Sequence, residues 1–303
     1  MSSSERIRDL SDVPSFPAIY AAALDPRRPR RPSPDRDPVL PARALRVRRV
    51  RIDGKRAAAF DHVMGGPATE RVHPGVLHVL AFPISLALMA GGDFPFRLLG
   101  LVHLHNRILQ HRPVRVEELV DVECRARGLE PHRRGWTFEA VSTIHGQDGT
   151  IIATDVSTYL VKARTASMDE SSREDRRRPV FDPPRPTGRW RLDAGTGRRY
   201  AEVSGDVNPI HMSALSARAF GFPRAIAHGM YTASRAFTEA RIDLARPLRW
   251  DVDFDAPVHL PSTVLVAFDE DPARSSVHCV GWRPPRDDRL ARRCFTSEVR
   301  MLD

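Results

Sequence analysis

The sequence predicts an α+β fold in which a helix followed by an antiparallel sheet occurs twice. The run from Val76 to Ala90 is apolar on nearly all sides, and a helix of that kind must be enclosed by other elements. Strand-like segments follow it one after another. Beyond a polar segment that ends in prolines, the same order of helix and strands returns, which indicates an internal duplication although the halves are not obviously similar residue by residue.

The first segments of the chain are short. We expect a helix over Ser15 to Leu24, a proline- and charge-rich surface excursion over Asp25 to Pro38, and a strand over Leu45 to Ile52. Asp53 can cap a helix that runs to about Met64, where Gly65 and Gly66 stop it.

The first predicted sheet follows the turn from Gly91 to Phe96. Its strands are expected at Leu98 to Gln110, Val114 to Arg127, Trp136 to His145 and Ile151 to Lys162. Because nothing else in this half could cover the apolar helix, the sheet must curl around it.

The second half is separated from the first by a charged, proline-ended linker, Thr165 to Pro186. We therefore predict domains at residues 1–164 and 187–303, joined by residues 165–186. In the second domain we expect helices over His211 to Phe220 and Gly229 to Ile242, and strands over Leu248 to Phe254, Thr263 to Asp269, Ser276 to Trp282 and Leu290 to Met301.

The composition narrows the class of protein. The 303 residues carry a net charge of +9, almost all of it from arginine, with only Lys55 and Lys162 as lysines. The arginines are scattered through every segment, whereas a nucleic-acid-binding protein is expected to gather them beside a reading motif, so we expect no nucleic-acid partner. This positive charge is better explained by binding of an acidic carrier protein or of the phosphate groups of a cofactor.

The cysteines Cys124, Cys279 and Cys294 are far apart and form no CxxC pair, so the sequence predicts neither a disulfide framework nor a zinc site. The first ten residues lack the apolar segment of a signal peptide. The longest apolar run is too short and too interrupted to span a bilayer. We therefore expect a cytoplasmic location without membrane insertion.

Candidate chemistry lies between Asp206 and His211, where six consecutive residues hold an acid, an amide, a proline and an imidazole. Gly205, Asn208 and Pro209 can turn the chain so that the two titratable side chains converge. Asn208 is also a natural N-cap for a helix that starts near His211. A capped turn without function is the simpler interpretation of this segment alone.

A second segment, Ala227 to Met230, reads AHGM at the start of an apolar helix. Gly229 there would present an unsatisfied backbone N–H and no side chain, as an oxyanion hole requires. Close packing of the helix start is the alternative, and His228 next to it could be a supporting or a core residue. Both segments together support proton transfer next to a carbonyl.

These two segments resemble the MaoC-like family of type 2 enoyl-CoA hydratases and dehydratases. The resemblance is close from Arg199 to Phe237, through the specific signature G-D-x-N-P-x-H. The first half resembles the noncatalytic repeat of double hot-dog members: it contains Gly92 and Asp93 but no following Asn-Pro and no matching histidine. The resemblance implies two hot-dog folds, each a sheet wrapped around a long buried helix, paired within one chain as a pseudo-dimer.

The resemblance also implies roles. Asp206 and His211 would activate the water that adds to a trans-2-enoyl thioester and would handle the α-proton, giving an (R)-3-hydroxyacyl product. The Gly229 N–H would stabilise the thioester oxygen, Asn208 would position the pair, and Gly205, Pro209 and His228 would support them. No metal or redox cofactor is implied. The thioester would be carried by coenzyme A or an acyl carrier protein, and chains could associate further.

Two other functions remain open from the sequence, a hot-dog thioesterase and a noncatalytic acyl-thioester binding subunit. The Asn-Pro-x-His arrangement favours the hydratase over the thioesterase. The intact pair Asp206 and His211 argues against a noncatalytic binding subunit. His103 and His105 alternate on a predicted strand without a third ligand, so we set them aside as metal ligands. His73 and His78 are interpreted as core residues or as residues that support the site. Ser171 to Arg178 is interpreted as a solvated linker, with a phosphate or carrier-protein contact as the lesser alternative.

Overall fold

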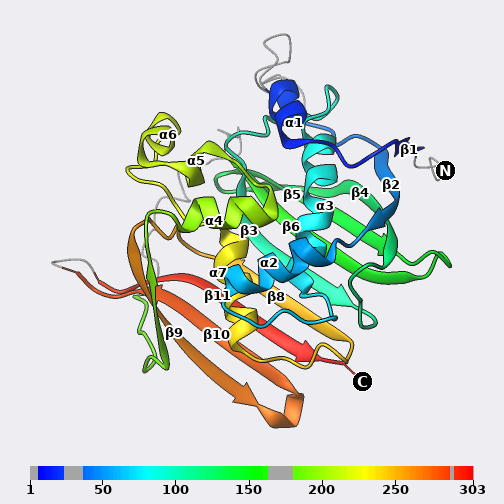
Figure 1. The fold of residues 1–303 in the computed structure, drawn as a ribbon. Helices are drawn as coiled ribbons and strands as arrows, with labels where there is room; N and C mark the ends of the chain where they lie inside the picture. Colours follow the sequence, from blue (N-terminus) through cyan, green and yellow to red (C-terminus); the bar gives the residue numbers. More distant parts are fainter. Residues whose placement is uncertain (1–5, 24–36, 163–179, 287–289, 303) are drawn as a thin grey trace. The chain divides into compact units, whose positions relative to one another are not determined.

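The computed structural model describes residues 6–23, 37–162, 180–286 and 290–302 (Figure 1). These residues form two compact units that are interleaved along the sequence. Unit 1 takes its residues from Met1–Ile52, His78–Asn106 and Glu117–Arg178, and unit 2 from Asp53–Leu77, Arg107–Val116 and Pro179–Asp303. Most of the predicted linker, namely residues 165–179 of 165–186, lies outside the described residues. The predicted boundaries at 164 and 187 stay a prediction.

Unit 1 is built on a sheet with the strand order β1-β2-β4-β5-β6-β3. β1 pairs with β2 in parallel, and the pairs β2–β4, β4–β5 and β5–β6 are antiparallel. The elements are β1 (Arg6–Leu10), α1 (Phe16–Ala23), β2 (Arg43–Arg51), most of α3 (Pro74–Met89), the first part of β3 (Val102–Gln110), β4 (Leu119–His132), β5 (Gly135–His145) and β6 (Ile151–Lys162).

The buried helix of unit 1 is α3, which lies against the face of this sheet (Figure 1). Most of its side chains are buried, as its apolar sequence predicted. Polar contacts between helix and sheet include the Ser85 and Ser142 hydroxyls, which lie 3.1 Å apart, and the Cys124 thiol, which contacts the carbonyl of Ala81 at 3.7 Å. The predicted enclosure of an apolar helix by a sheet is confirmed.

One polar cluster is buried in unit 1. His78 Nδ1 lies 2.7 Å from Asp155 Oδ2, and the Asn106 amide donates to the other oxygen of Asp155. The Ser157 hydroxyl in turn donates to Asn106 Oδ1. Each carboxylate oxygen thus has a hydrogen-bonding partner, as a buried charge requires. His78 is a core residue, as predicted.

Unit 2 contains a second sheet with the order β8-β11-β10-β9-β7, in which the pairs are antiparallel. Helix α7 lies against this sheet (Figure 1). The elements are α2 (Gly54–Met64), β7 (Gly188–Leu192), α4 (Thr196–Ser204), α5 (Pro209–Met212), α6 (Ala214–Ala219), α7 (Gly229–Glu239), β8 (Leu248–Phe254), β9 (Ser262–Asp271), the 3-10 turn Pro272–Arg274, β10 (Ser276–Arg283) and β11 (Arg292–Met301).

Helix α2 belongs to unit 2 although its sequence precedes the first sheet. Asp53 caps it by accepting a hydrogen bond from the Arg56 N–H at 2.7 Å, and Gly65 ends it in the left-handed conformation. Both ends agree with the predicted ones. Its buried face carries Phe60 and Met64, and the helix contacts α4 and α7. Unit 2 therefore takes part of its helical layer from far upstream in the chain.

Several elements differ from the predicted ones. The predicted helix His211 to Phe220 is wrong as one element, because Ser213 is extended and caps a new helix, α6, through its hydroxyl. Helix α7 ends at Glu239 rather than Ile242. Strand β4 begins at Leu119, later than the predicted Val114. Strands β1 and β7 and helix α4 were not predicted, since each is short and carries several charged residues.

In the parts of the chain that the structure describes, no helix is long and apolar enough to cross a membrane. The predicted surface excursion, residues 25–38, lies mostly outside the described residues.

Acid is expected to destabilise the fold through His73. This side chain of unit 2 is 5% exposed, and burial lowers its pKa to about 3. The unfolded chain therefore binds a proton that the folded chain does not, so stability is full above pH 6.5 and declines as the pH falls toward 3. One such histidine costs about 2 kcal/mol at pH 5. Melting temperatures of His73→Gln and wild type between pH 7 and 5 check this.

The variant should show a flatter dependence of melting temperature on pH. His62→Gln is the matched control, because His62 is exposed on α2, and it should keep the wild-type slope. An unchanged slope in His73→Gln would contradict the assignment.

Candidate active site

The candidate loop begins where α4 ends. Gly205 adopts φ 79°, the left-handed conformation, and donates its N–H to the carbonyl of Ala201 at 2.7 Å. The chain then turns: the Asp206 N–H donates to the Ser204 hydroxyl at 3.1 Å, and the Asn208 N–H donates to Asp206 Oδ1 at 3.1 Å. These local bonds fix both the backbone and the carboxylate of Asp206.

Asn208 caps the short helix α5, as the sequence predicted. Its side-chain oxygen accepts from the Ile210 N–H at 3.4 Å, and its backbone carbonyl accepts from the His211 N–H at 3.0 Å. Pro209 occupies the first position of the helix, where a missing N–H has no cost. The main chain of Asn208 thus links Asp206 and His211, while its side-chain amide caps the start of α5.

His211 is 8% exposed, and its ring orientation is set by one backbone contact. Its Nδ1 lies 2.8 Å from the carbonyl oxygen of Ile226. Because a carbonyl only accepts, Nδ1 carries the proton and the lone pair of the neutral ring is on Nε2. Burial lowers the pKa of His211, while the charge of Asp206 and the Ile226 carbonyl oppose this shift. The side chain is therefore neutral near pH 7, with Nε2 available as a base.

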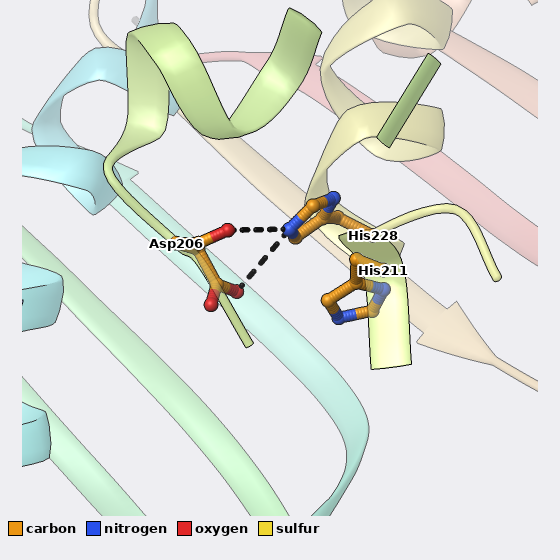
Figure 2. Close-up of side chains that lie close together, drawn as sticks. All are labelled: Asp206, His211 and His228. Atoms are coloured by element: carbon orange, nitrogen blue, oxygen red, sulfur yellow. Dashed lines mark hydrogen bonds and ion pairs between the residues drawn. The ribbon is translucent and has the colours of Figure 1, made fainter. Parts of the chain in front are cut away.

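His228 is 3% exposed and immediately precedes α7. Its Nε2 lies 2.9 Å from the backbone oxygen of Asp206 and 3.6 Å from Asp206 Oδ2 (Figure 2). Burial, and then the neighbouring His211, lower the pKa of His228 to about 3, so it is neutral with its proton on Nε2. Nδ1 has no hydrogen-bond partner among the described residues. The geometry makes His228 a neutral donor to Asp206.

The three side chains converge (Figure 2). One ligand-type atom from each of Asp206, His211 and His228 lies within 4.8 Å of those of the other two, the arrangement of a potential metal site within the described residues. However, the two imidazoles stack face to face, with centroids 3.7 Å apart and an angle of 28° between the planes. Lone pairs in nearly parallel planes do not converge on one ion, so the cluster suits proton transfer better than metal binding.

Tyr200 packs on one side of the cluster, and no motif in the sequence indicates this position. Its ring centroid lies 4.8 Å from that of His228 and 6.1 Å from that of Phe60 on α2. Burial raises the pKa of the Tyr200 phenol, and the nearby Asp206 raises it further. Tyr200 is therefore a neutral side chain that packs beside His228.

Gly229 is the first residue of α7, so its N–H has no acceptor within the helix. A Cβ at this position would lie 2.9 Å from Cε1 and 3.1 Å from Cδ1 of Phe254 on β8. The glycine is therefore also required for packing, as the alternative sequence interpretation held. The two roles of Gly229 are compatible. The Phe254 ring occupies the space of a Cβ at this position, and the N–H of Gly229 remains available as a donor.

Substitution of Gly229 by alanine is expected to lower turnover about 10-fold, because a displacement of the helix start moves its N–H relative to the reacting group. Steady-state kinetics of Gly229→Ala check this. The double variant Gly229→Ala/Phe254→Leu makes room for the methyl group and should recover part of the activity. Wild-type turnover in Gly229→Ala would contradict a role for this N–H.

Other residues of the site escaped the sequence analysis. Gly197 on α4 lies so close to the His211 carbonyl oxygen that an added Cβ would clash with it, so only glycine lets α4 and α5 approach. Arg56 on α2 contacts the end of α4. No motif marks either residue, since the contacts are tertiary.

In the first half of the chain, Asp93 forms a surface ion pair. Its carboxylate is 49% exposed and lies 2.7 Å from the Arg43 guanidinium.

A helix packed on an antiparallel sheet defines the hot-dog class of protein, and an acid beside a buried neutral imidazole at the start of that helix suits acid–base chemistry. A family model described as MaoC like domain matches residues 176–275. The 3-hydroxyacyl-thioester dehydratase X of Mycobacterium tuberculosis is 36% identical over 225 residues, which cover 74% of this chain and 79% of that protein. The chain belongs to the MaoC-like family of hydratases and dehydratases and is a hydro-lyase.

Solved structures agree with this assignment. The crystal structure of HtdX of Mycobacterium tuberculosis superimposes with a TM-score of 0.71 at 32% identity, covering 86% of this chain and all of that one. A second protein of that organism, described as a double hotdog fold, gives a TM-score of 0.51 at 14% identity and covers 84% of this chain and 93% of its own. The predicted double hot-dog fold is confirmed.

Proposed function

We propose that this chain interconverts trans-2-enoyl and (R)-3-hydroxyacyl thioesters, with Asp206 and His211 as the catalytic pair. The proposal rests on one observation above all: a carboxylate and a neutral imidazole whose Nε2 is not protonated converge with His228, the residue that precedes the first N–H of α7. A relative is named a 3-hydroxyacyl-thioester dehydratase, which supports a thioester as the substrate.

In the hydration direction, a water held between Asp206 and His211 loses a proton to the pair as its oxygen bonds to the β-carbon. The carbon–carbon double bond gives its electron pair to the α-carbon through the thioester enolate, and the pair returns a proton there. Dehydration reverses each step. Either residue of the pair could take either proton. The Gly229 N–H would donate to the thioester oxygen, whose charge grows in the transition state.

The supporting residues have separate tasks in this proposal. His228 donates to the backbone of Asp206, and its lowered pKa keeps it from competing for the transferred proton. Asn208 connects the catalytic pair through its main chain. Gly205 and Pro209 shape the turn. No step needs a metal or a redox cofactor.

We further propose a coenzyme A or acyl-carrier-protein thioester as the substrate form and a cytoplasmic location, both of which rest on the sequence. The pairing of the two hot-dog folds into a pseudo-dimer and any association between chains belong to the same proposal. A molar mass of one chain by light scattering would support a self-sufficient chain.

The test uses crotonyl-CoA and longer 2-enoyl-CoAs. We expect loss of the conjugated enoyl absorbance without release of free thiol, with the (R)-3-hydroxyacyl product identified by chiral chromatography. Release of thiol would instead indicate a thioesterase. Binding without either change would indicate an acyl-thioester binding subunit, and each of these outcomes overturns the proposal.

A further inference from the structure

The end of α4 carries an arginine contact that comes from a distant part of the sequence. Arg56 Nε donates to the carbonyl oxygen of Val203 at 2.7 Å, and its Nη2 donates to that of Ser204 at 2.8 Å. Arg56 lies on α2, nearly 150 residues upstream. Both hydrogen bonds lie within unit 2. They join the layer of α2 to the segment that immediately precedes the candidate loop.

These two carbonyls belong to the last turn of α4, where a helix leaves its oxygens without partners. Gly205 donates its N–H to the carbonyl of Ala201, one turn earlier. The carbonyls of Val203 and Ser204 receive no bond from this cap, and the Arg56 guanidinium donates to both. A positive charge at a helix C-terminus is also favoured by the helix dipole. The contact therefore fastens the last turn of α4, which ends at Gly205, to α2.

The contact is linked to Asp206 through short steps. Ser204, whose carbonyl Arg56 holds, accepts the Asp206 N–H through its hydroxyl at 3.1 Å. The Asp206 carboxylate then accepts the Asn208 N–H. A shift of the Ser204 backbone would therefore move the carboxylate and, through Asn208, the start of α5.

Arg56 is itself held by a packed helix. Its N–H donates to the capping Asp53, and one turn later Phe60 is 1% exposed and contacts the ring of Tyr200. Tyr200 in turn contacts His228. Helix α2 is therefore linked to the cluster in two ways: the guanidinium bonds to Ser204, whose hydroxyl accepts the Asp206 N–H, and Phe60 packs on Tyr200, which packs on His228.

We propose that Arg56 is a positioning residue for the reaction, which holds the carboxylate of Asp206 at the geometry required for proton transfer by clamping the end of α4. This inference rests on the proposed function for its kinetic consequence. Arg56 contacts backbone oxygens, so it acts through Asp206. Lysine cannot replace it fully, because a single ammonium lacks the planar fork that serves two carbonyls at once.

The kinetic test compares Arg56→Met and Arg56→Lys with wild type. We expect kcat to fall about 10- to 100-fold in Arg56→Met, because small displacements of a catalytic group are costly, with KM changed less than about threefold. Arg56→Lys should be intermediate. The matched control is Arg199→Met, which removes an arginine of α4 that pairs with Asp193 at 3.0 Å near the start of that helix. It should keep wild-type kcat.

A second readout does not depend on activity. Hydrogen exchange of the amides of Asp206 and Asn208 reports the bonds that hold the loop, and it should become about tenfold faster in Arg56→Met but not in Arg199→Met. Circular dichroism identifies a variant that fails to fold, in which case Arg56→Lys carries the test.

The outcomes separate the two proposals. If wild type does not hydrate enoyl thioesters yet exchange at the loop accelerates in Arg56→Met, the proposed function fails and the clamp stands as a loop-positioning contact. If wild type is active and Arg56→Met leaves both kcat and exchange unchanged, the positioning role is overturned. A rise in KM alone, at constant kcat, overturns it as well, because it would indicate substrate binding.

Discussion

Turnover of Asp206→Asn is expected to fall about 10²- to 10⁴-fold with the fold intact. Asparagine has the same shape, and its amide oxygen can still accept the Asn208 N–H that Asp206 Oδ1 accepts. The bond from His228 to residue 206 goes to the backbone and is also kept. What is lost is the negative charge and the capacity to take up a proton. Hydration of crotonyl-CoA measures the loss, and thermal melting measures the fold.

Asp193→Asn is the matched control for this variant. Asp193 precedes α4, pairs with Arg199 and is 66% exposed, so the same chemical change there should leave turnover near that of wild type. If Asp206→Asn retained near-wild-type hydration, the carboxylate would have no role in proton transfer and the proposed mechanism would be wrong.

Turnover of His211→Ala is also expected to fall about 10²- to 10⁴-fold, because the variant lacks the base at Nε2. It also loses the stacking on His228 and the bond to the Ile226 carbonyl. His211→Gln separates the two effects, since it retains a polar side chain that can donate to Ile226 but cannot act as the base. We expect turnover to fall to a similar degree in both variants.

The pH dependence provides an independent check on His211. The residue must be neutral to act as a base, and burial lowers its pKa below the usual 6.5. The kcat/KM of wild type should therefore stay constant as the pH falls through 6.5 and decline only at lower pH. His278→Ala, which removes an exposed histidine of β10, should show the same profile. A decline in wild type centred above pH 6.5 would contradict the assignment of His211.

The sequence predicted those parts of the molecule whose signal is local. The cap at Asp53, the stop at Gly65 and the apolar helix α3 each depend on neighbouring residues, and the structure has them where the sequence placed them. The cap at Asn208 is of the same kind. Periodicity and turn chemistry carry this information within a few residues, so one sequence was enough.

The rest depends on contacts between distant segments. The roles of Arg56, Tyr200 and Gly197 follow from where α2, α4 and α5 meet, and no spacing within the sequence marks that meeting point. The tautomer of His211 depends on a backbone oxygen of Ile226, which any residue could have supplied. Likewise, the grouping of α2 with unit 2 reflects packing of its apolar face and not its place in the chain.

The interleaving of the two units has a consequence for how the chain folds. Residues 53–77 leave the ribosome long before residues 179–303, which complete the same compact unit. Until then, Phe60 and Met64 of α2 have no complete core to enter, and such apolar surface promotes aggregation. Contacts of such high sequence separation also slow folding. Unit 2 is therefore expected to be completed only late in synthesis, with chaperones favouring its yield.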